Sequence, residues 1–212
     1  MKPNWYERTL LPWLIDSACS HGTVRRQREK VVPLAHGRVL EIGIGTGLNM
    51  RHYDKSRIRS LTGLDPALEM HTLAKKRIRR AGLEVDLVGL SAERIPRADA
   101  SFDTVIVTYT LCSIPDPLAA LKEMRRVLVP GGQLIFCEHG RAPDAGVRRW
   151  QERLTPWWKK VAGGCHLDRD IASLLEEAGF ACPDLKTMYL PGPRPLTYNY
   201  WGTAFVRAAH GG

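Results

Sequence analysis

The sequence predicts an α/β fold with a doubly wound, seven-stranded and mostly parallel β-sheet. Short runs of apolar and β-branched residues alternate with segments of helical periodicity along the chain. A glycine-rich turn at residues 43–47 follows the first apolar run and precedes a segment that can form a helix. With 212 residues, of which 44% are hydrophobic, the chain is long enough for a single domain with a sizeable core.

The chain carries a formal net charge of +9, with basic clusters at residues 25–30 and 75–80. This charge fits solvated helix faces, and it also fits contact with an anionic membrane surface or a nucleic acid. The sequence contains neither a zinc-binding pattern nor an aromatic RNA-binding strand. We therefore do not expect nucleic acid as a partner.

Five cysteines are scattered without a CxxC pair, which favours a reducing compartment over a disulfide framework. No apolar run approaches the roughly 20 residues of a membrane-spanning helix. Glu7 and Arg8 precede the short apolar run at residues 10–15, which argues against a cleaved signal peptide. We expect a cytoplasmic protein, and leave open a peripheral membrane contact through its basic and Trp-rich helices.

Residues 1–36 are predicted to form N-terminal helices that serve as a lid or a support for the main domain, residues 37–212. The first helix, residues 4–20, is amphipathic, and Pro12 is expected to kink or restart it. The second, residues 24–35, is basic on one side. Tryptophans in the first helix also suit an interfacial membrane anchor.

The glycine turn is the most informative stretch of the chain. Gly43, Gly45 and Gly47 remove side chains, so a ligand can lie against bare backbone close to a helix N-terminus. No Gly-Lys-Ser/Thr follows, and the spacing is G-x-G-x-G, so the P-loop is excluded and the dinucleotide fingerprint does not match. The Glu41 carboxylate suits a cationic ligand. The turn resembles motif I of the class I S-adenosylmethionine (SAM)-dependent methyltransferases.

The second predicted strand, residues 61–65, ends in an acidic residue. Asp65 follows the glycine turn at close to the roughly 20-residue spacing at which a strand-end carboxylate meets ribose hydroxyls. A carboxylate can accept hydrogen bonds from both hydroxyls. Pro66 then ends the strand, and a helix is predicted to run from Met70 until Gly82 stops it.

The third strand, residues 85–90, leads into Ser91, Ala92 and Glu93. This segment resembles the part of the methyltransferase motif that flanks adenine. In that family the first position is often Asp, which binds the adenine amine. Here Ser91 departs from the pattern, although the backbone at Ala92 can still contact the adenine ring.

The fourth and fifth strands are expected at residues 104–109 and 133–137, with a helix at residues 118–128 that Pro130-Gly131-Gly132 ends. Both strands finish in polar residues, at the edge where an open α/β sheet keeps its ligands. The fifth strand leads into His139, whose ordinary pKa lies near neutral pH. These strand ends are therefore the predicted place of catalysis.

A helix at residues 143–162 carries three tryptophans at helical spacing. They either pack on the core or roof an apolar substrate pocket. A loop, a helix at residues 171–178 and two closing strands, residues 187–190 and 200–206, complete the chain. The link at residues 191–196 is too rich in proline for regular structure.

From about residue 30 to 208 the motifs together resemble the seven-stranded class I methyltransferases, a Rossmann-like layout whose last strand is antiparallel. Within that superfamily, the segments at residues 111–114 and 164–169, with Glu138, His139 and Trp150, are similar to the small thiol S-methyltransferases of the methyltransferase-like group. Those are membrane-associated in animals, and they carry a hydrophobic N-terminal anchor that we do not expect here. Other elements are similar to quinone and phospholipid methyltransferases.

The resemblance implies SAM as cofactor, with S-adenosylhomocysteine (SAH) as product, and a small, lipophilic acceptor, best assigned as a thiol. His139 is predicted to remove the thiol proton or stabilise the thiolate, His166 is a second candidate, and Tyr109 lines the methyl-transfer channel. The predicted cofactor-binding residues are Glu41, Gly43, Gly45, Thr46, Gly47, Asn49, Asp65, Pro66, Met70, Ser91, Ala92, Glu93 and Thr108.

Several alternatives remain open. A quinone or phospholipid could replace the thiol as acceptor. A non-catalytic SAM- or nucleic-acid-binding protein is the competing class, supported by the net charge alone. No metal is expected, because Asp116 stands alone after the fourth strand. An arsenite methyltransferase would need several cysteines converging on one pocket, and only Cys112 and Cys165 are placed to reach it. The oligomeric state is undetermined.

Overall fold

The computed structural model describes residues 10–207. One sheet runs in the order β3-β2-β1-β4-β5-β8-β6, and β7 pairs with β8 off this path. The strands are β1 (Gly37–Ile42), β2 (Ile58–Leu64), β3 (Asp86–Val88), β4 (Phe102–Thr108), β5 (Leu128–His139), β6 (Phe180–Ala181), β7 (Lys186–Tyr189) and β8 (Tyr198–Val206). The α-helices are α1 (Leu11–Ser20), α2 (Gly22–Val31), α3 (His71–Ala81), α4 (Pro117–Val127), α5 (Ala145–Val161), α6 (Ile171–Glu177) and α7 (Arg194–Thr197).

The sheet is parallel from β3 to β5 and antiparallel where β8 joins β5. The predicted doubly wound sheet with an antiparallel last strand is therefore confirmed. The strand count is eight because β6 and β7 pair with successive parts of β8. β1 lies between β2 and β4, so its carboxyl end opens onto the centre of the sheet, where ligands bind in this kind of fold.

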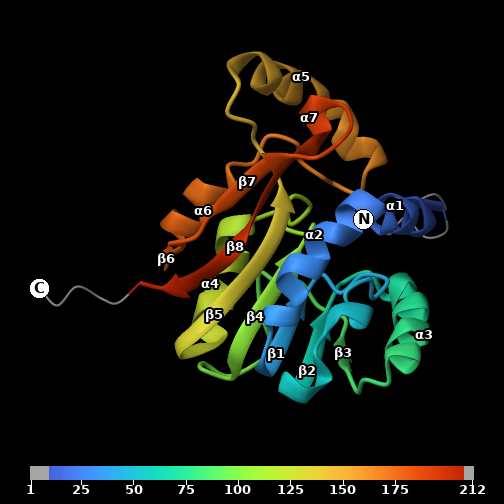
Figure 1. Ribbon diagram of the computed structural model, residues 1–212, viewed down its shortest axis with the longest axis vertical. Coiled ribbons are helices and arrows are strands. Elements are labelled where there is room, and N and C mark those ends of the chain that lie inside the picture. Colours follow the sequence, from blue (N-terminus) through green and yellow to red (C-terminus); the bar gives the residue numbers. More distant parts are fainter. Residues whose placement is uncertain (1–9, 208–212) are drawn as a thin grey trace, which may run out of the picture.

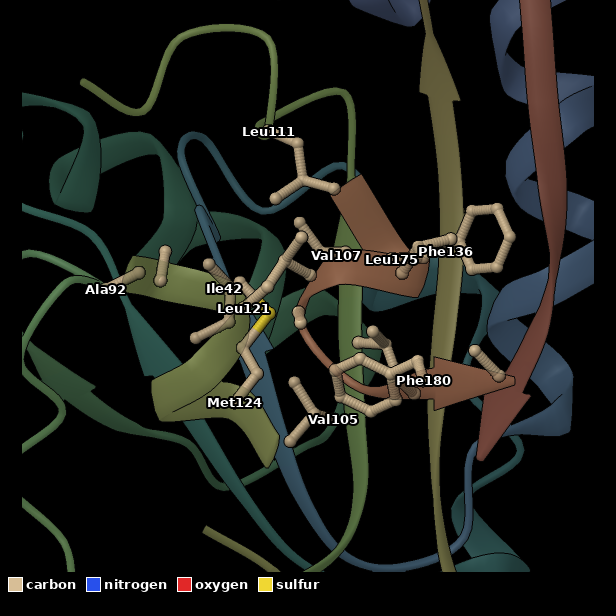
Figure 2. Close-up of a cluster of buried hydrophobic side chains, with 14 of the residues drawn as sticks. Ile42, Ala92, Val105, Val107, Leu111, Leu121, Met124, Phe136, Leu175 and Phe180 are labelled. Atoms are coloured by element: carbon tan, nitrogen blue, oxygen red, sulfur yellow. The ribbon is translucent and has the colours of Figure 1, made fainter. Parts of the chain in front are cut away.

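Alternating side chains of each strand build two cores, one on each face of the sheet. Leu40 and Ile42 of β1 point to the face that α4 and α6 cover, while Val39 points to the face covered by α2 and α3. Figure 2 shows part of the first core, in which Met124 and Leu175 pack with strand residues. This alternation places Glu41, like Val39, on the side of α2.

Local sequence signals set the ends of several helices. Asp116 caps α4 by accepting a hydrogen bond from the Ala119 N–H (2.9 Å), and Asp170 caps α6 in the same way. Gly82 ends α3 in the left-handed conformation, with φ of 61°. The stop at Gly82 agrees with the sequence-based prediction.

Two expectations about the elements were wrong, and one strand was not foreseen. Helix α4 already ends at Val127, and Pro130-Gly131-Gly132 lies inside β5 instead. The proline-rich link contains the short helix α7, because Pro195 sits in its first turn, where a missing N–H costs nothing. The two-residue strand β6 was not anticipated, since it is too short to show a period.

The N-terminal segment differs in extent from the expectation. α1 begins at Leu11 with Pro12 in its first turn, so the proline starts the helix. Residues 4–9 of the expected helix lie outside the described part of the chain. Figure 1 shows α2 running across the face of the sheet and α1 beside its upper edge. None of the helices within residues 10–207 has the length and apolar character needed to cross a membrane.

Helix α5 lies with α7 beyond the edge at which β5 ends (Figure 1). The expectation that its tryptophans pack on the core was wrong for two of them. Trp150 is 56% and Trp157 71% exposed. Trp158 instead lines a cavity, in agreement with the alternative that this helix roofs a pocket.

Candidate active site

The glycine turn adopts a conformation that only glycine reaches without strain. Gly43, Gly45 and Gly47 all have positive φ, of 67°, 51° and 80°. A Cβ at Gly43 would lie 2.2 Å from the side chain of Thr110, while one at Gly45 would meet only ordinary contacts, the nearest with Met70 Sδ at 3.6 Å. The turn thus presents bare backbone at Gly45 with Met70 beside it.

Glu41 lies at the centre of a buried polar network beneath this turn. Its carboxylate accepts hydrogen bonds from the Asn49 amide (3.0 Å) and the Tyr53 hydroxyl (2.7 Å). Burial raises the pKa of Glu41 to about 7, although Tyr53 and the nearby Arg28 act in the opposite direction. The Glu41 carboxylate is therefore enclosed by Asn49 and Tyr53 and is almost fully buried.

Arg28 of α2 completes this network and was missed in the sequence. The residue is 6% exposed, and its guanidinium donates hydrogen bonds to Asn49 Oδ1 (2.9 Å) and Thr108 Oγ1 and lies 5.1 Å from the centre of the Tyr109 ring. Its Nε is buried without a partner. A periodicity signal was present, because Val24, Arg28 and Val31 fall on one face of α2.

Asp65 reaches back to the glycine turn. Its carboxylate accepts hydrogen bonds from the backbone N–H groups of Gly45 and Ala67, both at 2.8 Å. Burial raises the pKa of Asp65 although these hydrogen bonds lower it. Each oxygen retains a further lone pair. Pro66, next in the chain, is exposed.

Helix α1 is fastened to the turn by a second acid. Asp16 accepts hydrogen bonds from Thr46 Oγ1 and from two nitrogens of Arg77 at 2.6 and 2.9 Å, and Arg77 also donates to the Thr46 carbonyl (2.9 Å). Burial alone would raise the pKa of Asp16, but the hydrogen bonds from Arg77 and Thr46 lower it. The side chain of Thr46 is therefore engaged with α1.

The segment predicted to flank adenine is internally bonded. The Glu93 carboxylate accepts hydrogen bonds from the Ser91 hydroxyl (2.7 Å) and from the Asp116 backbone N–H (2.8 Å). Ala92 is buried in the core. Glu93 thereby joins the loop after β3 to the start of α4, and the backbone at residues 91–93 is fixed beside the sheet edge.

A cavity of about 560 Å³ opens at the carboxyl ends of β4 and β5, between α1, α5 and the chain before β8. Its walls include Tyr109, His139 and Trp158 together with apolar residues. Tyr109 has φ of 54°, unusual for a bulky residue and typical of functional sites. Its hydroxyl donates a hydrogen bond to Asn199 Oδ1 (2.8 Å) of β8.

Three side chains with sulfur or nitrogen donors converge in this cavity. Cys112 Sγ, Cys165 Sγ and a ring nitrogen of His139 all lie within 4.8 Å of one another, and His139 Nε2 is 3.1 Å from Cys165 Sγ. A hydrogen bond from Cys165 lowers the pKa of Cys112. Burial acts to lower the pKa of His139, but Cys112 and Glu138 together raise it above its ordinary value. No such set of ligands was expected from the sequence.

His166 lies close to this group but is not among the residues that line the cavity. Its backbone N–H donates to the Cys112 carbonyl (2.8 Å), and its ring lies 3.8 Å from the Asp168 carboxylate. Burial lowers the pKa of His166. The geometry thus gives His139, rather than His166, direct access to a molecule in the cavity.

Comparisons with known proteins agree with this geometry. The family of methyltransferase domains matches residues 40–136. The thiol S-methyltransferase TMT1B of Homo sapiens is 37% identical over 153 residues, 69% of this chain and 62% of that protein. TMT1A of Homo sapiens is 33% identical over 172 residues, 76% of this chain and 69% of that protein. The chain belongs to the class I SAM-dependent methyltransferases.

Other members of this family are also similar to the chain. Demethylmenaquinone methyltransferase of Bacillus velezensis is 30% identical over 138 residues, 56% of this chain and 59% of that protein. Among solved structures, the trans-methyltransferase CalH in complex with SAH has a TM-score of 0.63 and 26% identity, covering 93% of this chain and 59% of that one. The chain spans about three fifths of the length of TMT1B.

The site of this methyltransferase fits SAM, the cofactor that the family uses. The bare backbone at Gly45 and the Asp65 carboxylate suit a nucleoside, and the unpartnered Nε of the buried Arg28 suits the amino-acid carboxylate of SAM. The polar network around Asn49 would meet the amino group. The individual cofactor contacts stay predictions.

Proposed function

We propose that this methyltransferase transfers a methyl group from SAM to the sulfur of a small, lipophilic thiol. The observation that carries the proposal is the largely apolar cavity whose walls include His139 and Tyr109 at the carboxyl ends of β5 and β4. A thiol suits it because an ordinary thiol pKa of about 8.5 requires little help for ionisation. Relatives named thiol S-methyltransferases support the same acceptor.

Bound SAM supplies an activated methyl group on a sulfonium. The chain's own residues then align the acceptor and exclude water. Such alignment can lower the activation barrier by several kcal/mol. His139 lines the cavity at the end of β5, where its imidazole can accept the thiol proton or stabilise the thiolate. The hydrogen bond from its hydroxyl to Asn199 fixes the Tyr109 side chain in the cavity wall.

A quinol or a phospholipid amine is the second class of acceptor, favoured by the apolar lining of the cavity and by a relative that acts on demethylmenaquinone. An amine or alcohol needs a proton acceptor more than a thiol does. A SAM-binding protein without catalysis would bind SAH and transfer no label.

The test is incubation with methyl-labelled SAM and a panel of thiols, quinols, amines and aminophospholipids. Labelled product is expected from lipophilic thiols. His139→Ala should lower kcat/KM for the thiol by about 100-fold while the affinity for SAH, measured by calorimetry, stays unchanged. Product from another acceptor class alone would refute the thiol proposal, and unchanged turnover in His139→Ala would refute the role of His139.

We further propose a peripheral membrane contact through the exposed faces of α1 and α5. Trp13 and Trp157 are exposed, and Lys159 and Lys160 lie beside the latter; aromatic and basic residues together suit an anionic interface. Sedimentation with anionic vesicles should fall for Trp157→Ser. Glu84→Gln, an exposed change on another surface, is the control, and equal sedimentation of Trp157→Ser and the control would contradict the contact.

A further inference from the structure

Cys112, His139 and Cys165 form a cluster in the wall of the cavity, here called the Cys2His site. The three residues follow β4, end β5 and follow α5, so distant parts of the chain meet at one point. Their donor atoms lie within 4.8 Å of one another. No local motif such as CxxC joins them in the sequence.

We infer that the Cys2His site binds a zinc-like soft metal ion, which holds the acceptor thiolate during methyl transfer. Thiolate and imidazole are the ligands that zinc prefers. Zn–S bonds of about 2.3 Å and Zn–N bonds of about 2.0 Å place tetrahedral ligand atoms roughly 3.5–3.8 Å apart. The observed cluster needs only small side-chain movements to reach those separations.

The three ligands leave the fourth tetrahedral position open, which is typical of catalytic rather than structural zinc sites. All three residues line the cavity of about 560 Å³, together with Tyr109 and Trp158. An acceptor entering this cavity can therefore reach the metal. At that position a soft sulfur ligand is favoured over an amine or an alcohol.

The backbone around Cys112 is held in place by buried groups. The Glu138 carboxylate accepts hydrogen bonds from the N–H groups of Thr110 (2.8 Å) and Leu111 (3.1 Å), and the His166 N–H fixes the Cys112 carbonyl (2.8 Å). Such support is what a precise metal site needs. It also gives His166 a structural part without direct contact with the acceptor.

This inference rests on the proposed thiol methylation and adds the means of activation. The acceptor thiol gives its proton to water as its sulfur takes the open position. A lone pair of that sulfur forms the new bond to the methyl carbon. The bond from this carbon to the sulfonium breaks, its electron pair stays on the departing sulfur, and neutral SAH and a methyl thioether result. His139 then acts as a neutral ligand, and the metal supplies the positive charge.

The test is metal binding by the full chain, read without reference to activity. The reduced, chelator-treated protein is titrated with Co²⁺, which reports tetrahedral thiolate ligation by its visible and near-ultraviolet bands, and zinc content is measured after Zn²⁺ loading. Cys112→Ser and Cys165→Ser are compared with Cys19→Ser, a change in the same cavity outside the site, and with the distant Cys182→Ser. Circular dichroism and SAH affinity establish that each variant is folded.

We expect about one ion per wild-type chain, and a shift of the cobalt bands when a small thiol is added. Cys112→Ser and Cys165→Ser should each weaken metal affinity by more than about tenfold, and Cys19→Ser and Cys182→Ser should not. Folded wild-type protein that takes up no ion, or that keeps its bands in both site variants, would overturn the inference. So would a Cys112–Cys165 disulfide that persists under reducing conditions.

The two proposals fail in different ways. Thiol methylation that continues in metal-free protein refutes the metal and leaves the thiol acceptor standing. Stoichiometric metal binding that depends on the Cys2His site, with label transferred only to amines or quinols, refutes the thiol acceptor.

Discussion

At Asp65, two backbone N–H groups hold the carboxylate that is predicted to contact the ribose. We expect Asp65→Ala to weaken SAH binding by at least about tenfold, because it removes the acceptors for the ribose and releases the Gly45 N–H. Isothermal titration calorimetry with SAH measures this loss.

The matched control is Asp86→Ala, an acid at the start of β3 whose exposed side chain pairs with Arg97. An exposed pair of this kind contributes little, so SAH affinity should stay near the wild-type value. Equal affinities for the two variants would remove Asp65 from the cofactor site.

The residues predicted from the sequence are those whose role depends on residues close to them in the chain. Gly43, Gly45 and Gly47 are recognisable because the turn needs positive φ at each of them. Arg28 and Cys165 were not assigned roles in the site, because their partners lie far away in the chain and only the packed sheet brings them together. Local patterns therefore indicate the cofactor turn, while the acceptor side of the site depends on tertiary contacts.

At the scale of elements, α1 is held to the cofactor turn by Asp16. Asp16→Asn should loosen α1, because it removes the charge that Arg77 pairs with, a partly buried contact contributing about 1 kcal/mol. Hydrogen exchange should rise in α1, and SAH should dissociate several-fold faster, as expected for a lid.

Glu29→Gln, which breaks the exposed Arg25–Glu29 pair on α2, serves as the control for that variant. It should change neither exchange in α1 nor the rate of SAH release. If Asp16→Asn loosens α1 but leaves SAH release at the control value, the segment is a support and the lid role is wrong.

The elements themselves were largely predictable, because strand and helix periods differ and glycine or aspartate marks many ends. β6 and α7 were missed for the opposite reason: two and four residues are too few to show a period. The exposed tryptophans of α5 follow a regular helical spacing. Such spacing does not distinguish a helix face that packs on the core from one that contacts a ligand or another surface.

At the scale of the whole molecule, the network around Glu41 links α2, the sheet and the glycine turn. Burial raises the pKa of Glu41 to about 7 from 4.5. A raised folded-state pKa means that the folded protein binds this proton more tightly, so the stabilisation is complete below about pH 4.5 and is lost as the pH rises through about 7. The loss is on the order of 3 kcal/mol.

Glu41→Gln should therefore flatten the fall in the free energy of unfolding between about pH 5 and 8, because the amide has no proton to lose and still offers an oxygen to Asn49. Urea denaturation followed by circular dichroism across this range measures the slope. Glu84→Gln, at an exposed position, should keep the wild-type slope. Parallel profiles for wild type and Glu41→Gln would show that this carboxyl is ionised throughout, and the network would then hold a charge at its centre rather than a shared proton.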